Sequence, residues 1–158
     1  MRSVTAVVFA TVTLAGCAGG GGGAAPAPAT PAPAAPAAAA GPSLYERLGG
    51  QPAITAVVDS FVNLVAADTR INALFRGVDI PNLKRLLAEQ ICQATGGPCT
   101  YSGRSMREAH RGMSITNRQF DALVGDLVAA LDAFRVPATE KSELLTALGG
   151  MRRDIVGQ

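Results

Sequence analysis

The chain has 158 residues, of which 48% are hydrophobic and 16% are charged, and its formal net charge is +2. A charge this small, with no basic cluster, excludes the electrostatic footprint of a nucleic-acid-binding protein. The length allows one small domain with a single core once the unusual N-terminal part has been set aside.

The first 16 residues have the pattern of a signal peptide. Arg2 precedes an apolar run that is too short for a permanent transmembrane helix. The run ends in Leu14-Ala15-Gly16-Cys17, which resembles the lipobox of bacterial lipoproteins, where the cysteine becomes the acylated first residue. An ordinary secretory signal that contains a cysteine is the alternative. We expect a lipoprotein signal peptide at 1–16, lipidation at Cys17, and an exported protein anchored to a bacterial envelope membrane by its lipid alone, on the periplasmic face.

Residues 18–42 contain only Gly, Ala, Pro and one Thr. Without large apolar side chains this segment cannot bury enough surface to offset its ordering entropy. Its glycine run is not followed by the Lys-Ser/Thr pair and helix of a phosphate-binding loop. The composition predicts a disordered tether at 17–42, followed by one domain at 43–158.

The remaining residues, 43–158, show helical periodicity throughout. Apolar side chains recur at intervals of three and four residues, as in Ile54, Val57, Val58, Phe61, Val62 and Val65, and no segment alternates as a half-buried strand does. Prolines stand where a first helical turn tolerates them, and Thr116 with Gln119 forms a capping-box pattern. The pattern predicts an all-α domain with helices near 44–48, 52–66, 69–74, 81–95, 104–112, 117–134 and 138–156.

Two polar residues fall on apolar helical faces. Gln90 interrupts a leucine stripe, where it either finds a hydrogen-bond partner or reaches water at the stripe's edge. His110, the only histidine, shares a face with Met106 and Met113. It is either a satisfied, half-exposed side chain or a metal ligand. A zinc site needs about four His or Cys ligands, whereas heme iron needs only one protein imidazole.

The sequence contains few other motifs that indicate catalysis or covalent chemistry. No Gly-x-Ser-x-Gly elbow occurs, and the single histidine has no Ser or Asp arranged around it, so no hydrolytic triad is expected. Asp121 and Asp126 are expected on the solvent face of their helix. An oxidising compartment favours a disulfide between Cys92 and Cys99, and two free thiols are the alternative. No Cys-x-x-Cys-His motif is present, so any heme would be held without covalent links.

Several blocks of the sequence resemble the group 1 truncated hemoglobins: SLYERLGG at 43–50, LFRGVD at 74–79, GGPCTYSGRSMREAHRGMSIT at 96–116 and DLVAALDAFRVP at 126–137. They stand in family order and span nearly all of 43–158. The resemblance implies a truncated globin fold, in which helices pack two over two around a heme b that binds a diatomic gas.

The resemblance also implies roles for individual residues. His110 matches the proximal iron ligand, and Phe75 matches the phenylalanine that packs on the heme. Lys84 lies where a basic group near a heme propionate is expected, or alternatively it coordinates the iron itself. The cofactor-binding positions implied by the resemblance are Phe75, Lys84, Leu87, Tyr101, Met106, Ile115 and Phe120.

The chain departs from the family on the distal side, where the gas binds. Many group 1 members carry Phe-Tyr where this chain has Phe61-Val62, and positions often occupied by polar residues fall on or near Leu83 and Leu87. Gln90 is the nearest polar side chain. Without a hydrogen-bond donor in the distal wall, O₂ is expected to dissociate about tenfold faster or more than from family members that have the tyrosine. A second histidine ligand is excluded because the chain has none.

Three functions follow from this sequence. The leading one is reversible binding of O₂, CO or NO through a heme held by His110. The second is a heme enzyme, either an NO dioxygenase or a peroxidase-like protein, which needs an electron donor that the sequence does not identify. The third is a heme-free helical module, tethered for protein contact, in which His110 is incidental.

Overall fold

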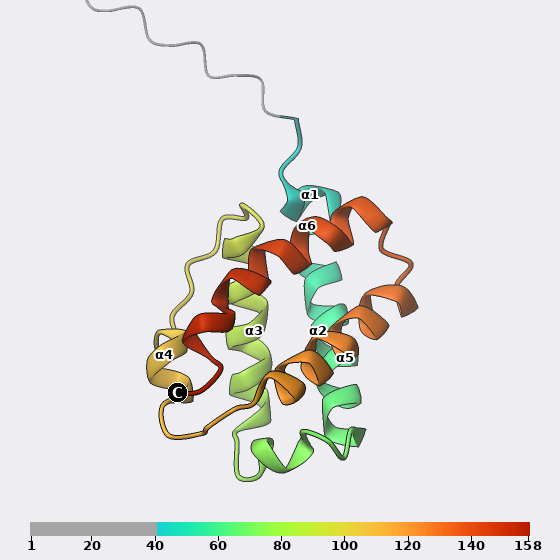
Figure 1. Cartoon of the computed structure of the whole chain (residues 1–158). Coiled ribbons are helices and arrows are strands. Elements are labelled where there is room, and N and C mark those ends of the chain that lie inside the picture. Colours follow the sequence, from blue (N-terminus) through green and yellow to red (C-terminus); the bar gives the residue numbers. More distant parts are fainter. Residues whose placement is uncertain (1–40) are drawn as a thin grey trace, which may run out of the picture. The chain divides into compact units, whose positions relative to one another are not determined.

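The structure is a computed structural model that describes residues 41–158, and within that part every regular element is a helix. The expected signal peptide, Cys17 and nearly all of the tether lie outside the described residues. In chain order the elements are α1 (Leu44–Arg47), α2 (Gly50–Ala67), the 3₁₀ helix η1 (Asn72–Phe75), α3 (Ile80–Ala94), α4 (Met106–His110), α5 (Asn117–Ala133), α6 (Ala138–Gly149) and the 3₁₀ helix η2 (Gly150–Asp154) (Figure 1). The predicted all-α fold is therefore confirmed. Among the described helices, none combines the length and apolar character needed to cross a membrane.

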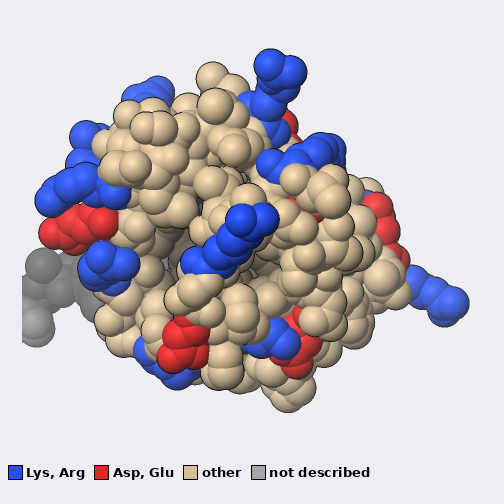
Figure 2. Space-filling view, turned by 90° about the horizontal axis from the view of Figure 1, so that it is seen from below, with Lys and Arg blue, Asp and Glu red and all other residues tan. Residues whose placement is uncertain are grey.

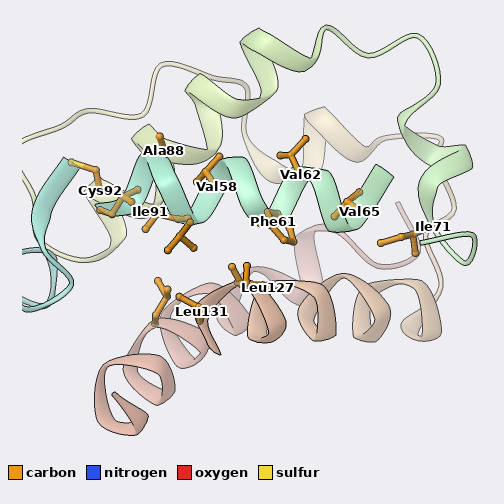
Figure 3. Packing of buried hydrophobic residues seen from close by; sticks show 14 of the residues in the cluster. Val58, Phe61, Val62, Val65, Ile71, Ala88, Ile91, Cys92, Leu127 and Leu131 are labelled. Carbon is orange, nitrogen blue, oxygen red and sulfur yellow. The ribbon is translucent and has the colours of Figure 1, made fainter. Parts of the chain in front are cut away.

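Helix α2 lies at the centre of the core. It packs against α3 on one side and α5 on another, and α6 contacts both α3 and α5. The six apolar residues predicted to share a face of α2 are all buried. In Figure 3, Phe61 points toward α5, where Leu127 lies, whereas Val62 points toward the side on which α3 lies. The helices α2 and α3 thus form one layer, and α5 and α6 form the other.

Three predicted helices are shorter or more tightly wound than the sequence indicated. The segment at 69–74 forms only the 3₁₀ turn Asn72–Phe75, and the segment at 104–112 forms a helix only from Met106 to His110. Gly112 has a φ of 80° and Ser114 a φ of 48°, conformations that end a right-handed helix. The helix predicted at 138–156 stops at Gly149 and continues as a 3₁₀ helix, since paired glycines favour the α conformation weakly.

Helix α3 buries the side chains of its second half more completely than the leucines of its first half. Its buried residues are Ala88, Ile91 and Cys92, which belong to the same core cluster as α2. The predicted stripe residues Leu83 and Leu87 are only half-buried. Large aliphatic side chains that are left half-buried indicate a face that the rest of the chain does not fill completely.

Asp126 does not lie on the solvent face predicted for it. Its side chain is 14% exposed, and its Oδ2 atom is buried without a hydrogen-bond partner in the described structure. Burial, and then the nearby negative charge of Asp68, raise the pKa of Asp126, while Arg70 pulls the pKa of Asp68 down through a hydrogen bond. The sequence pattern missed this burial because the chain between α2 and η1 covers this part of α5. Asp121 does lie at the surface, paired with Arg152.

We expect Asp126→Asn to stabilise the fold at pH 7 by about 0.5–1 kcal/mol, because an amide can donate to Asp68 while a buried, unpartnered carboxylate oxygen cannot. The raised pKa of Asp126 means that its ionisation opposes folding. This cost grows as the pH rises through the unfolded-state pKa toward the folded-state pKa, so the gain from the substitution should shrink in acid.

Urea unfolding of the wild type and the variant from pH 3 to 8 measures this difference. The exposed Asp121→Asn on the same helix is the control, and its effect at pH 7 should stay within about 0.5 kcal/mol. An Asp126→Asn variant that is less stable than the wild type at pH 7 would contradict the account.

Candidate functional site

The described apolar interior consists of two clusters rather than one. The larger is built around α2 and includes residues of α3, α5 and α6. The smaller has Ile115, Phe120 and Ile155 at its centre, with Met106, Met151 and other partly buried residues around it. A domain of this size usually has one contiguous core. Part of the boundary between the clusters runs between α3 and α4, where Gln90 of α3 contacts Met106 of α4.

Gln90 of α3 reaches across this boundary. Its Nε2 lies 3.2 Å from the sulfur of Met106 and 2.9 Å from the sulfur of Met151, both in the smaller cluster. Thioether sulfur is a weak acceptor, so the half-buried amide is poorly satisfied. The sequence left two interpretations of Gln90 open. The structure supports the first, because the side chain points inward to a hydrogen-bond partner and not to water at the edge of the stripe.

His110 ends the short helix α4 and is half-buried. Its Nδ1 lies 2.7 Å from the backbone carbonyl oxygen of Met106, one turn earlier. A carbonyl oxygen can only accept, so Nδ1 carries the proton and donates it. In the neutral ring the lone pair then sits on Nε2, the arrangement that a metal-ligating histidine uses. No protein partner of Nε2 occurs among the hydrogen bonds of the described residues.

Local hydrogen bonds position α4 and its histidine. Ser105 caps the helix and forms a capping box with Glu108, whose pKa the Ser105 hydroxyl lowers by donating a hydrogen bond to the carboxylate. The Tyr101 hydroxyl donates to the carbonyl oxygen of Arg104 at 3.0 Å. Burial raises the pKa of Tyr101. The resemblance implied a cofactor-binding role for Tyr101, and in the structure its hydroxyl braces the backbone that leads into α4.

Four of the five predicted distal residues line a small, mostly apolar cavity, and Gln90 is not among its lining residues. The cavity has a volume of about 120 Å³, and its lining comprises Phe61, Val62, Asn63, Val65, Ala66, Phe75, Ile80, Leu83 and Leu87. Five of these residues were predicted for the site: Phe61, Val62, Phe75, Leu83 and Leu87. The structure thus brings the C-terminal half of α2, η1 and the start of α3 together around one space, with no charged side chain in its lining.

A larger hollow lies elsewhere and holds none of the predicted site residues. Its volume is about 590 Å³, and it is lined by Arg70, Thr116, Arg118, Gln119, Asp121 and Ala122. Figure 2 looks onto the lower end of the view in Figure 1, and this face is hollowed at its centre, with basic side chains at several places around it. The charged lining of the larger hollow makes it unlike the apolar space beside α3.

Two site residues differ from their expected surroundings. Lys84 forms an ion pair with Asp59 of α2, with 3.0 Å between Nζ and Oδ1, so its ammonium group already has a partner there and links α2 to α3. Met151 of η2, which the sequence analysis did not single out, lies against Gln90. Its position in the chain, far from the other site residues, carries no signal of this contact, which depends on the docking of η2 against α4.

Cys92 and Cys99 are joined by a disulfide, with their Cα atoms 5.8 Å apart. The bond links the last turn of α3 to the connection that leads into α4. Only glycine fits at position 97 beside this bond. A Cβ there would lie 2.6 Å from both the Cys92 sulfur and the Tyr45 ring, which is too close for either contact.

Comparison with known proteins agrees with this geometry. The profile of the bacterial-like globins matches residues 43–156. The chain is 36% identical to the group 1 truncated hemoglobin GlbN of Mycolicibacterium paratuberculosis over 113 residues, which cover 72% of this chain and 83% of that protein.

Two solved structures show the same fold. The truncated hemoglobin of Tetrahymena pyriformis in its Fe(III) form superposes with a TM-score of 0.72 at 32% identity, covering 74% of this chain and 100% of that one. The 2/2 hemoglobin of Synechococcus, solved in the cyanomet state with covalently attached heme, gives 0.69 at 34% identity, covering 73% and 98%. With its family profile, its relatives and its two-over-two helices in agreement, the chain belongs to the bacterial-like globins and, within them, to the group 1 truncated hemoglobins.

Proposed function

We propose that this protein binds heme b non-covalently between α3 and α4, with His110 as the protein ligand of the iron, and that it binds a diatomic gas reversibly. The orientation of His110 carries the proposal, because the Met106 carbonyl fixes the proton on Nδ1 and leaves the Nε2 lone pair for a metal. The family supports it, since the solved relatives include an Fe(III) form and a heme-bound form.

The residues around His110 fit a porphyrin. The half-buried leucines of α3 and the methionines of the smaller cluster offer apolar contact to its faces, and Phe75 lines the cavity that lies between α2, η1 and α3. The Gln90–thioether contacts are weak, so little is lost when a cofactor replaces them. Cys92 and Cys99 are already bonded to each other, and no thiol remains among the described residues for a covalent link to heme.

When bound, heme supplies an iron centre with one imidazole ligand and a coordination position open to a gas. The chain's own residues decide how long the gas stays. Val62, Leu83 and Leu87 present only hydrocarbon to the cavity. This wall favours rapid, reversible binding over NO dioxygenation, which needs a long-lived gas complex and an electron donor. Asn63 of α2 is the one amide in the lining of this cavity, and Gln90 of α3, which contacts Met106 and Met151, is the candidate donor outside it.

We expect the purified protein to bind hemin with a strong Soret band, and His110→Ala to lose it, because no other histidine can replace the ligand. Titration with hemin, followed by visible absorption, measures this. Arg111→Ala, an exposed neighbour at the end of the same helix, is the matched control and should bind as the wild type does. Equal binding by the wild type and His110→Ala would refute the proposed role of His110.

The apolar distal wall makes a second prediction. Val62→Tyr should release O₂ about tenfold more slowly than Val62→Phe, because the two rings fill similar space and only tyrosine offers a hydroxyl donor. Stopped-flow displacement of O₂ by CO measures the rates. Gln90→Leu should release O₂ faster than the wild type if Gln90 donates to the gas. Equal rates for Val62→Tyr and Val62→Phe would show that Val62 does not face the gas.

We also propose that the protein is exported and anchored by lipid on Cys17. The support is the order of Arg2, the apolar run and the Leu-Ala-Gly-Cys sequence. In a bacterial host the wild type should sediment with membranes and carry the mass of added acyl chains, while Cys17→Ser should lose that mass. Cys17→Ser retained with the same acyl mass would contradict the lipidation.

A further inference from the structure

The connection between α3 and α4, residues 95–105, is held against α3 along its length. At its start, the Cys92–Cys99 disulfide closes a short loop across a sequence separation of 7. Further along, the Tyr101 amide donates to Oε1 of Gln93 at 2.5 Å, and the Ser102 amide donates to Oε2 of Glu89 at 3.1 Å. The connection therefore runs back along α3 and places Met106 in contact with Gln90.

These contacts differ in strength. The hydrogen bonds of Tyr101 and Ser102 are exposed, and water competes for both donors and acceptors, so each contributes little net free energy. The disulfide is the one covalent link between α3 and this connection. Cys92 is fully buried beneath Tyr45 and Gly97, and Cys99 is partly buried.

Helix α4 cannot hold itself in place. It has five residues, far fewer than the roughly 12–15 that an isolated helix needs for even marginal stability. The connection from α3 precedes this helix, and a turn with Gly112 and Ser114 follows it. The positive φ angles of Gly112 and Ser114 prevent the helix from continuing. The position of His110 relative to α3 therefore depends on how firmly residues 95–105 are anchored.

We propose that the Cys92–Cys99 disulfide is a redox-sensitive brace, meaning that it holds the segment of residues 95–112 with His110 in place. Reduction of the disulfide makes this segment more mobile and weakens the binding of the cofactor. The part of this inference that concerns heme rests on the proposed function. The part that concerns the mobility of residues 95–112 rests on the disulfide and the length of α4 alone.

The reductant is a dithiol. One thiolate attacks the partly exposed Sγ of Cys99, breaks the Cys92–Cys99 bond and forms a mixed disulfide, and the Cys92 thiolate leaves and takes up a proton. The second thiol of the reductant then displaces Cys99, which also ends as a thiol. The protein gains two electrons and two protons, and the reductant becomes a disulfide.

Transfer of hemin from the loaded protein to an excess of apomyoglobin tests the proposal. We expect loss of hemin to be at least about tenfold faster after treatment with dithiothreitol. A disulfide that closes a short loop typically shifts the equilibrium between the ordered and the disordered segment by more than about tenfold. Cys99→Ser should lose hemin as fast as the reduced wild type and should not respond to dithiothreitol, which controls for effects of the reductant on heme. Equal loss by the oxidised, reduced and Cys99→Ser proteins would overturn the proposal.

Hydrogen exchange of the heme-free protein separates this inference from the proposed function. Reduction should speed exchange at residues 98–112 while leaving α2 and α5 unchanged. If hemin does not bind at all but exchange responds in this way, the proposed function fails and the brace stands. If exchange at residues 98–112 is the same in both redox states, the brace is refuted whether or not hemin binds.

Discussion

The burial of α2 between α3 and α5 is the interaction on which the rest of the structure depends. Six side chains of α2 enter the core, and each contributes about 1.5–3 kcal/mol relative to an exposed position. Because α2 needs apolar neighbours on two sides, α3 and α5 must lie against different faces of it. With its buried residues packed against α2, α3 leaves Gln90 to contact Met106 of α4, where the candidate site lies.

The site is built from groups that the fold satisfies poorly. The Gln90 amide has only thioether acceptors, the large leucines of α3 are half-buried, and a cavity remains beside Phe75. Each of these features costs stability in comparison with a filled apolar core. All three features involve α3: Gln90 faces the smaller cluster, whereas the cavity lies between α3, α2 and η1. Asp126 shows that an unsatisfied group also occurs elsewhere in the domain. Their concentration along α3, together with the Nε2 of His110, which has no protein hydrogen-bond partner among the described residues, is what marks this region as the candidate binding site.

His110 owes its orientation to a local contact and its position to distant ones. The hydrogen bond to the Met106 carbonyl spans one helical turn and needs only the local sequence. The placement of that turn against α3 needs the disulfide, the capping box of Ser105 and the packing of η2 against α4. A side chain on so short a helix is therefore only as rigid as the segments that surround it.

The sequence by itself determined the helical class and the buried face of α2, because periodicity and helix caps act over a few residues. The apolar face predicted for His110 is confirmed only in part, since Met106 is half-buried but Met113 lies beyond the end of α4 and is exposed. The sequence also indicated the family through ordered motifs. The tertiary structure alone decided that the Oδ2 atom of Asp126 is buried, that Lys84 pairs with Asp59, and that Met151 contacts Gln90. Each of these joins residues from separate elements, and local spacing carries no information about which elements pack together.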